Sequence, residues 1–399
     1  MNINIVVYPA KNGDCFLISY GEEEKRGQKH FLIDCGYTDT IKNYLKEDLT
    51  RIGTKGEILE KLILTHIDAD HIQGAIRLLK DNNSQKFIEI KEIWHNTFRH
   101  LFEKKQLAID KNQEKRLEQI IQRGYPAKKS EIKGEQEISA EQGTTVGALI
   151  LKGEYSWNSD FDGNAICIDF QKEIIVDKNV KLLLLSPDKE KLEKLKKLWK
   201  DELQRYGANY DRGSSEFYDD AFEMAMTWEK EMPKKRPTTI SAAKETIEEL
   251  LQLPFEEDTT PTNGSSIAFI LQIKEKKLLF LADAHPNLIV QSLKDYQNDG
   301  TIIFDFIKVS HHGSFNNVNK NLLEKIDSPK YLISTNGGRH NHPDKETIAH
   351  IISRPADFHR KIWFNYITNN SEYFDRDDWG KTYNYSIHYL NQAPYTLSL

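Results

Sequence analysis

The stretch "LILTHIDADHIQG", residues 62–74, contains the residue types best suited to chemistry. It places His66, Asp68, Asp70 and His71 within six positions. In an extended or turning segment, residues two apart point the same way, so the first three side chains can converge while His71 turns toward a neighbouring point. Imidazoles and carboxylates aimed together suit Zn²⁺, Mn²⁺ or iron, and four such donors can form part of two adjacent ion sites. The segment therefore predicts a metal site.

A polar loop that only caps the following helix is the alternative interpretation, with Asp70 as the N-cap. Capping needs one carboxylate, and it does not explain two carboxylates placed between two histidines. The metal site is the better hypothesis.

The elements that must position these residues alternate between strands and helices. The apolar residues 62–64 predict a strand before His66, and Ile72, Ile76 and Leu79 predict a helix from His71 to about Lys80. Upstream, "INIVVYP" and "CFLISY" predict a hairpin, "HFLIDCG" a third strand, and residues 38–53 a helix. Further strands are predicted at "EIKEIWHN", "AICIDF", "VKLLLLSP", "SSIAFILQI", "KKLLFLADAH", "FDFIKVSHH", "YLISTNGG", "KIWFNYI" and "YNYSIHYL".

Two segments of the first half have a different character. Residues 97–123 have the apolar spacing of a helix on an otherwise charged surface. The segment "GEYSWNSDFDGNA" places Tyr155, Trp157 and Phe161 among small polar residues, which is typical of a loop over a pocket. A loop anchored by ordinary aromatic packing is an equally good interpretation.

The composition is that of a globular chain with one large core or two domains. Of the 399 residues, 38% are hydrophobic, and no run approaches the roughly 18 apolar residues of a membrane helix. The N-terminus shows no cleavable leader, and Cys15, Cys35 and Cys167 lie in apolar surroundings, as expected for buried strand thiols in a reducing cytoplasm. The net charge of −6 argues against a protein that coats nucleic acid.

Residues 188–258 are mostly charged and helix-forming, so we expect a helical insertion between residues 1–187 and residues 259–399. The segment "DKEKLEKLKKLWK" places Leu192, Leu195 and Trp199 on one face and lysines on the others. Those lysines could face a phosphate backbone, although a lysine-rich helix is usually only a solvated face.

Polar clusters recur at the ends of the later predicted strands. Asp283 and His285 lie in "LADAHPN", His311 and His312 in "KVSHHGS", and His340 and His342 in "GGRHNHP". One pair could be an accident of packing, but recurrence at successive strand ends indicates a shared site.

With these motifs in order, the chain resembles the metallo-β-lactamase superfamily, and within it the ComEC-type branch, the nuclease domain of bacterial DNA-uptake proteins and its soluble relatives. The matching segments run through most of the chain: "NGDCFLI", "FLIDCG", "LTHIDADHIQG", "NGSSIAFIL", "LFLADAH", "KVSHHGS" and residues 334–343.

The resemblance implies an α/β (α+β) fold, an αββα sandwich with metals at one edge. His66 and Asp68 would bind one ion, and Asp70 and His71 the other. Asp283 would bridge them, with His312 a further ligand and His311 beside it. Asp34 would be structural. Asn263, Ser266, His340 and His342 would bind substrate.

Two departures from the commoner superfamily pattern affect the choice of metal. Asp68 stands where histidine is usual, and Asn263 stands in the place of another histidine, twenty residues before Asp283. The site is therefore richer in oxygen donors, which moves preference from Zn²⁺ toward Mn²⁺ or Mg²⁺. The loss of a ligand also leaves open a single bound ion in place of two.

The leading hypothesis is phosphodiester hydrolysis, most readily of DNA. Two divalent ions would lower the pKa of a water and clamp the attacking and leaving oxygens at phosphorus. Asp70 would orient the attacking hydroxide, and His342 or His312 would assist the leaving oxygen. The chain lacks the membrane channel of the uptake proteins, so their transport is not expected of it.

Three other functions stay open. Relatives with this motif include enzymes that act on small phosphodiesters such as phosphorylcholine esters or cyclic nucleotides. A metal-stabilised interaction subunit of a multi-gene system, such as phage defence, is a candidate of another class, with the insertion as the surface for a protein partner. Hydrolysis of a carbon ester or a β-lactam is the weakest alternative.

Overall fold

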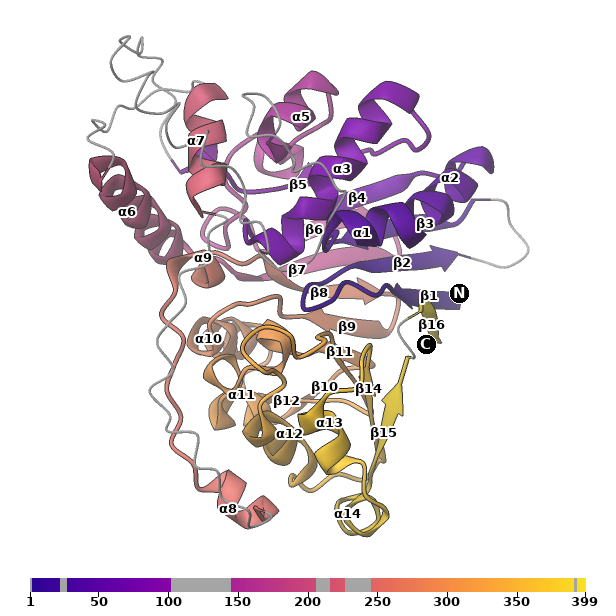
Figure 1. Cartoon of the computed structure of the whole chain (residues 1–399), viewed down its shortest axis with the longest axis vertical. Coiled ribbons are helices and arrows are strands. Elements are labelled where there is room, and N and C mark those ends of the chain that lie inside the picture. The colour runs from indigo at the N-terminus through magenta and orange to yellow at the C-terminus, as the bar shows by residue number, and fades with distance from the viewer. Residues whose placement is uncertain (1, 22–26, 102–144, 206–215, 227–244, 391–392) are drawn as a thin grey trace, which may run out of the picture.

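Two mixed β-sheets face each other in the computed structural model, which describes residues 2–21, 27–101, 145–205, 216–226, 245–390 and 393–399 (Figure 1). The first sheet has six strands, in the order β16 (Tyr395–Ser398), β1 (Asn2–Val7), β2 (Phe16–Gly21), β3 (Lys29–Ile33), β4 (Leu59–Ile63) and β5 (Ile93–Trp94). Its strands β16 to β3 pair antiparallel, whereas β3, β4 and β5 are parallel.

The second sheet has eight strands, in the order β15 (Tyr385–Tyr389), β14 (Arg360–Phe364), β13 (Lys330–Ile333), β11 (Phe306–Lys308), β9 (Lys276–Phe280), β8 (Ala268–Ile273), β7 (Val180–Ser186) and β6 (Glu173–Asp177). Strands β6 to β9 form an antiparallel meander, and β9 to β15 are parallel. A separate parallel pair consists of β10 (Ile302–Ile303) and β12 (Ile326–Asp327).

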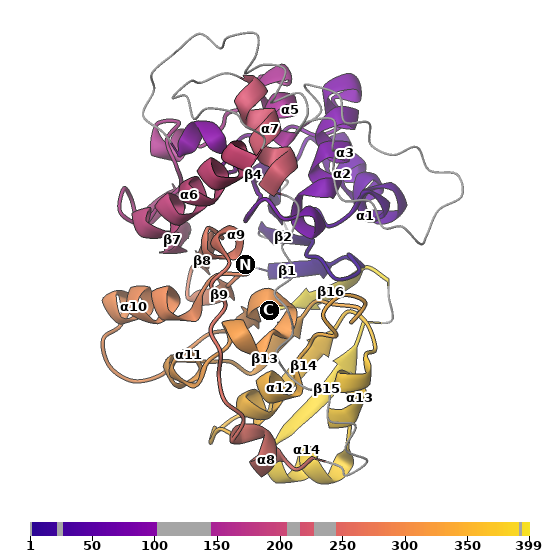
Figure 2. The ribbon, with the colours of Figure 1, turned by 60° about the vertical axis from the view of Figure 1, so that its left-hand side comes forward.

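Helices cover the outer face of each sheet (Figures 1 and 2). Over the first sheet lie α1 (Thr38–Thr40), a π-helical turn (Ile41–Leu45), α2 (Lys46–Thr54), α3 (Ala69–Gln85), α5 (Val146–Lys152), α6 (Lys189–Arg205) and α7 (Glu216–Met226). Over the second lie α8 (Ile247–Leu251), α10 (Pro286–Tyr296), α11 (Lys320–Lys325), α12 (Lys345–Ile352), α13 (Asn369–Phe374) and α14 (Asp377–Tyr383). The short helix α9 (Pro261–Gly264) precedes β8.

Side-chain alternation along the strands produces this four-layer arrangement. In β3, Phe31 and Ile33 face the core between the sheets, whereas Leu32 joins the core under the helices. Leu278 and Leu279 in β9 divide in the same way. Each sheet is thus apolar on both faces, which requires helices outside and a second sheet inside. The expected αββα sandwich is confirmed.

The predicted hairpin and all strands predicted for the second half are present. "AICIDF" is not a strand: residues 165–167 have no regular structure and residues 168–170 form a turn. The amide of Asn96 explains the difference, because it accepts from the Ile166 N–H and donates to its carbonyl, so this backbone needs no sheet partner. The strand at "EIKEIWHN" shrinks to the two residues of β5.

Other expectations have simpler outcomes. Most of the helix predicted at 97–123 lies outside the described residues. Cys15, Cys35 and Cys167 are buried free thiols, as expected, but none of them lies within a strand: Cys15 directly precedes β2, Cys35 lies in the loop after β3, and Cys167 has no regular structure. No described helix is long and apolar enough to cross a membrane.

The described parts of residues 188–258 lie in two places. Helices α6 and α7 pack on the first half, where Leu195, Trp199 and Phe222 enter the core above the first sheet. Helix α8 lies at the opposite end (Figure 1), where Ile247 and Leu250 enter the core below the second sheet. The expected helical insertion therefore contributes helices to both halves.

Asp327 is a structural anchor of the second half. Its carboxylate accepts from Arg360 Nη2 at 2.6 Å, from Arg354 Nη2 at 3.1 Å and from the Tyr331 hydroxyl at 2.9 Å. Burial alone would raise the pKa of Asp327, but the two arginines hold it below its ordinary value. A carboxyl with a lowered pKa stabilises the fold above its unfolded pKa, and this contribution is lost as the pH falls.

Asp327→Asn is expected to lower the free energy of unfolding by about 3–5 kcal/mol at pH 7, because it leaves buried arginine charge uncompensated. The difference from the wild type should shrink as the pH falls below about 4. Urea unfolding at pH 7 and at a pH below about 4 measures this difference. Asp305→Asn, which breaks an exposed pair with Lys276, is the matched control and should cost about 1 kcal/mol or less. Equal losses in the two variants would contradict this role.

Candidate metal centre

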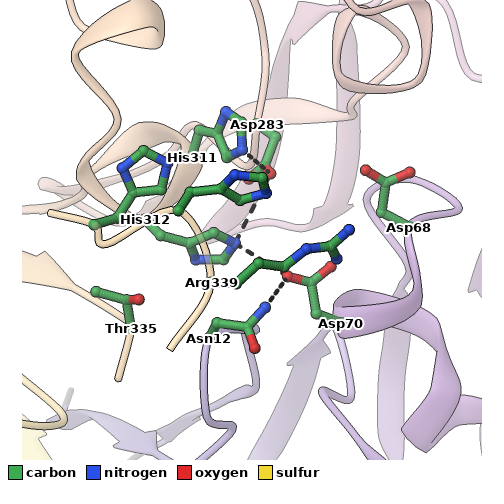
Figure 3. A pocket seen from close by; sticks show the side chains of 10 residues that line it. Asn12, Asp68, Asp70, Asp283, His311, His312, Thr335 and Arg339 are labelled. Atoms are coloured by element: carbon green, nitrogen blue, oxygen red, sulfur yellow. Dashed lines mark hydrogen bonds and ion pairs between the residues drawn. The ribbon is translucent and has the colours of Figure 1, made fainter. Parts of the chain in front are cut away.

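The histidines and carboxylates singled out by the sequence meet at one edge of the sandwich, where parallel strands end. The His66–His71 segment follows β4 and begins α3, Asp283 follows β9, and His311 and His312 follow β11. The loop 334–343 follows β13. Carboxyl ends of parallel strands share one sheet edge, so residues far apart in sequence converge there. Figure 3 shows Asp70, Asp283 and His312 of this set pointing toward one another.

Asp283 lies at the centre of the cluster and is 3% exposed. The Nε2 atoms of four imidazoles surround its Oδ2, those of His66 at 3.7 Å, His71 at 3.8 Å, His311 at 3.6 Å and His312 at 3.8 Å. Four ring nitrogens around one carboxylate oxygen are close enough to share metal ions with it. They are too far away for direct hydrogen bonds.

Hydrogen bonds at the other ring nitrogen explain why each Nε2 faces inward. His71 Nδ1 donates to Asp34 at 2.8 Å, and His312 Nδ1 donates to the Ser334 carbonyl at 2.8 Å. A neutral imidazole that donates through Nδ1 carries its lone pair on Nε2, which is the form that binds metal. These partners therefore fix both the ring orientation and the tautomer.

His66 and His311 follow the same rule through intermediate groups. The Thr65 hydroxyl donates to Asp34, so it can accept from His66 Nδ1 at 3.0 Å. The Asn317 amide nitrogen donates to the Asp283 carbonyl, so its oxygen accepts from His311 Nδ1 at 2.7 Å. All four Nε2 atoms are thus prepared as ligands.

Asp34 supports the ligand loop from behind. It accepts from the backbone N–H and the hydroxyl of Thr65 and from His71 Nδ1, each at 2.8 Å. Both oxygens are used in these bonds, which leaves Asp34 to orient its neighbours.

The two remaining carboxylates lie on opposite sides of the cluster. Asp68 Oδ2 is 3.7 Å from His66 Nε2, and Asp70 Oδ2 is 3.6 Å from His312 Nε2. Three sets of donor atoms lie close enough to hold an ion, namely His66 with His71 and Asp283, Asp70 with His71 and His312, and Asp14 with Asp34 and His71. In the third set Asp34 already accepts hydrogen bonds at both oxygens. The first set lies on the His66 side of the cluster and the second on the His312 side, and either could hold an ion.

Several polar atoms in this cluster are buried without a hydrogen-bond partner among the described residues. They are Nε2 of His66, His71 and His312 and Oδ1 of Asp283. A polar atom left unpaired in the interior costs about 1–3 kcal/mol. Convergence of several on one point is explained if divalent cations complete the site, and the residues present fit such ions.

The charged groups of the cluster shift one another's pKa values. Burial would raise the pKa of Asp283, but the imidazoles of His311, His312 and His71 hold it well below its ordinary value. Burial would lower the pKa of His71, yet Asp34 and Asp283 raise it well above its ordinary range. The carboxylates are therefore ionised and suited to bind cations, and an ion bound at His71 would displace the proton from its Nε2.

The loops that deliver the ligands carry unusual backbone conformations. Positive φ angles occur at Asp34 (51°), Ala282 (47°), His311 (42°), His312 (53°) and His340 (56°). Non-glycine residues rarely adopt this region, and such strain concentrates at functional sites.

Gly13 is required for a close approach of the β1–β2 turn. A Cβ at this position would lie 1.9 Å from the Asp70 carbonyl oxygen, so no larger residue fits. The close approach brings Asn12 to Asp70, and its Nδ2 donates to Asp70 Oδ2 at 2.7 Å.

Above the cluster lies a pocket of about 280 Å³, part of which is open to solvent (Figure 3). It is lined by Asn12, Asp68, Asp70, Asp283, His311, His312, Thr335, Arg339, His340 and His342. The carboxylates thus share the pocket with a wall of arginine and imidazoles.

Of the residues expected to bind substrate, His340 and His342 line this pocket, whereas Asn263 and Ser266 are buried outside its lining. His342 Nδ1 lies 3.2 Å from Asp344, and burial lowers the His342 pKa. Tyr155, Trp157 and Phe161 do not line it either. Trp157 donates to the His95 carbonyl, so this loop is held by ordinary packing and hydrogen bonds.

The capping alternative for the central motif does not describe its geometry. The N-cap of α3 is Asp68, whose side chain makes no capping hydrogen bond, and Asp70 lies in the first turn.

Sequence reasoning missed several residues that support or line the site, namely Asn12, Asp14, Asp258, Asn317, Thr335 and Arg339. Asp14 forms a buried ion pair with Lys308 behind His312, and its Oδ1 is 3.6 Å from His312 Nδ1. Asn12 and Asp14 lie in "NGDCFLI" and Arg339 lies in "GGRHNHP". The sequence connects both segments with the site, and this is the only indication that it holds for these three residues.

Comparison with known proteins agrees with this geometry. Residues 9–136 match the family model of the metallo-beta-lactamase superfamily. This match includes Asp34 and the whole His66–His71 motif. A search of the curated proteins finds no match to the chain.

The similarity to this superfamily begins at residue 9. The four-layer fold, which continues to the C-terminus, agrees with the sandwich of that superfamily. The match and the His/Asp clusters together indicate a metal-dependent hydrolase.

Proposed function

We propose that this protein is a metal-dependent phosphodiester hydrolase, with DNA as the first substrate to test. The observation that carries the proposal is the pairing of a buried carboxylate and imidazole cluster with a wall of arginine and imidazoles in the same small pocket. Such a pair suits an anionic substrate that is attacked at phosphorus, because the cluster holds the ions and the wall holds the phosphate oxygens.

Two divalent ions, Zn²⁺ or Mn²⁺ with Mg²⁺ as a further candidate, would supply an activated water and neutralise phosphate charge when bound. The protein then contributes position and proton transfer. Asp70, which Asn12 holds at 2.7 Å, orients the attacking oxygen. His342 and His312 line the same pocket and are the candidates to assist the leaving oxygen.

Arg339 provides the only guanidinium among the residues that line the pocket. A guanidinium binds phosphate oxygens by paired, charge-assisted hydrogen bonds. Arg339→Ala is expected to raise KM about tenfold, since one such bond contributes about 1.5–3 kcal/mol, with a smaller change in kcat. Steady-state kinetics measure the changes in KM and kcat separately, with Arg376→Ala, at a partly exposed arginine, as control. An unchanged KM would remove Arg339 from substrate binding.

A small phosphodiester, such as a phosphorylcholine ester or a cyclic nucleotide, is the second candidate substrate. It is favoured by the confined pocket, whose described lining contains no lysine. The lysines of α6 offer limited support for a nucleic-acid surface, because Lys194 and Lys196 pair with glutamates of the same helix. Exposed pairs of this kind are typical of a solvated face.

Cleavage of labelled single- and double-stranded DNA beside a small phosphodiester tests the proposal, with Mn²⁺, Mg²⁺, Zn²⁺ or EDTA present. Metal-dependent DNA cleavage supports a nuclease. Activity on the small ester alone moves the second candidate to first place. No hydrolysis of any phosphodiester by metal-loaded protein contradicts the proposal and favours an interaction subunit.

A further inference from the structure

The Asn263 side chain, just before β8, has one half of its amide bonded and the other half buried without a partner. Asn263 is 2% exposed, and its Nδ2 donates to Asp258 Oδ2 at 2.7 Å. Its Oδ1 is fully buried and accepts no hydrogen bond within the described part of the chain. A buried amide oxygen without a donor is costly, so a bound group is expected at this atom.

Asp258 determines which way the amide faces. Its Oδ1 accepts from the Thr260 N–H at 2.8 Å, and its Oδ2 accepts from Asn317 Nδ2 at 3.1 Å as well as from Asn263. A carboxylate surrounded by donors can only accept, so the nitrogen of the Asn263 amide must face it. The oxygen is thereby turned away from Asp258.

Backbone contacts place Asn263 beside the loop that carries His66. The N–H of Ile267 donates to the carbonyl of Thr65 at 2.8 Å, and the N–H of Ser266 donates to the Asn263 carbonyl at 3.0 Å. The chain that leaves α9 is thus attached to the end of β4, one residue before His66.

A second set of contacts connects α9 to the loop that carries Asp283. Asn317 Nδ2 donates both to Asp258 and to the carbonyl of Asp283, at 3.1 and 3.0 Å. A Cβ at Gly264 would lie 2.8 Å from His285 Cε1, so α9 packs directly on this loop. Asn263 therefore lies between two loops that supply ligands.

His285 is not a competing ligand at this position. Lys191 Nζ lies 2.7 Å from His285 Nδ1 and can only donate to it. A neutral imidazole that accepts at Nδ1 carries its hydrogen on Nε2, which then has no lone pair for a metal. The unpaired oxygen of Asn263 is consequently the better donor beside the His66 side of the centre.

We propose that Asn263 Oδ1 is a ligand of the divalent ion on the His66 side, and that Asp258 is the positioning residue that orients its amide. The proposal rests on the proposed function only in requiring metal at this centre. A neutral oxygen here adds to the carboxylates of Asp68 and Asp283. Oxygen-rich sites suit Mn²⁺ or Mg²⁺, whereas an imidazole in the same place would favour Zn²⁺.

Metal binding by the full chain tests the proposal without reference to turnover. The Asn263→Leu variant removes the oxygen and keeps the number and branching of the side-chain heavy atoms. Asn263→His supplies an imidazole in its place, and Asp258→Asn removes the orienting charge. Binding of Mn²⁺ and Zn²⁺ is titrated calorimetrically, metal content after dialysis is measured, and thermal unfolding reports folding. Asn298→Leu, at an exposed asparagine, is the matched control.

Asn263→Leu is expected to weaken Mn²⁺ binding at one of two ions by at least about tenfold and to leave the other unchanged. Asp258→Asn is expected to weaken the same ion by about 10–100-fold, as loss of an orienting partner usually does. The affinity for Zn²⁺ relative to that for Mn²⁺ should be higher in Asn263→His than in the wild type. Wild-type affinity for both ions in Asn263→Leu would overturn the proposal.

If Asn263→Leu does not fold, Asn263→His decides the question: a raised preference for Zn²⁺ supports the proposal, and an unchanged preference overturns it. Different results would contradict the proposed function and the ligand assignment. Wild-type protein that binds two ions through Asn263 and hydrolyses no phosphodiester would contradict the function alone. Metal-dependent hydrolysis together with unaltered metal binding in Asn263→Leu would contradict only the ligand assignment.

Discussion

Asp283→Asn is expected to remove both ions and to lower kcat by at least about a thousandfold. The carboxylate lies 3.6–3.8 Å from four imidazole Nε2 atoms, which include members of both donor sets, so we expect it to hold the ions on both sides. Asparagine keeps the shape but lacks the charge needed to hold two cations together. The ions supply several kcal/mol of transition-state stabilisation, and each 1.4 kcal/mol corresponds to a factor of about ten in rate.

Metal content and single-turnover hydrolysis, measured on the same preparation, check this prediction. Asp305→Asn is a control for the chemical change, because it places the same substitution at a partly exposed surface pair. Retention of two ions per chain by Asp283→Asn, with activity near that of the wild type, would show that Asp283 is not the shared ligand.

Asp70→Ala is expected to abolish turnover by a different route. Asp70 belongs to the donor set with His71 and His312, so its loss should weaken only the ion on that side. The attacking oxygen also loses the carboxylate that orients it. Folding should be nearly intact, because the partners lost are the side-chain amide of Asn12 and the imidazole of His312.

Metal analysis distinguishes the two variants. Asp70→Ala is expected to retain about one ion per chain and to unfold close to the wild-type temperature, whereas Asp283→Asn retains neither ion. Full metal-dependent activity in Asp70→Ala would make the assignment of Asp70 wrong. Loss of both ions in Asp70→Ala would show that the two metal positions are not separable as described.

Much of this centre could be predicted because its ligands follow apolar strands directly. Asp283 and His312 follow the parallel neighbours β9 and β11, and a parallel sheet brings such ends together. His66 follows β4 of the other sheet, so its place beside them also depends on how the two sheets face each other. The layer order follows similarly from strands that are apolar on both faces.

The supporting groups could not be predicted because their partners are distant in sequence and have no periodic pattern. Asn317 connects His311 to Asp258, which lies 59 residues away along the chain. Lys308 is buried against Asp14, a pairing that depends on how the two sheets face each other. The Asn96 side chain takes the place of a strand partner for the backbone of Ile166. A pattern of apolar residues does not predict this either.

The most direct test of the central claim is hydrolysis of a generic phosphodiester, bis(4-nitrophenyl) phosphate, by metal-stripped protein to which Mn²⁺ is returned in steps. We expect no turnover in EDTA, a rise that saturates at about two ions per chain, and no rise in Asp283→Asn. Wild-type turnover by the stripped protein, or none at full metal occupancy, would contradict a metal-dependent phosphodiesterase.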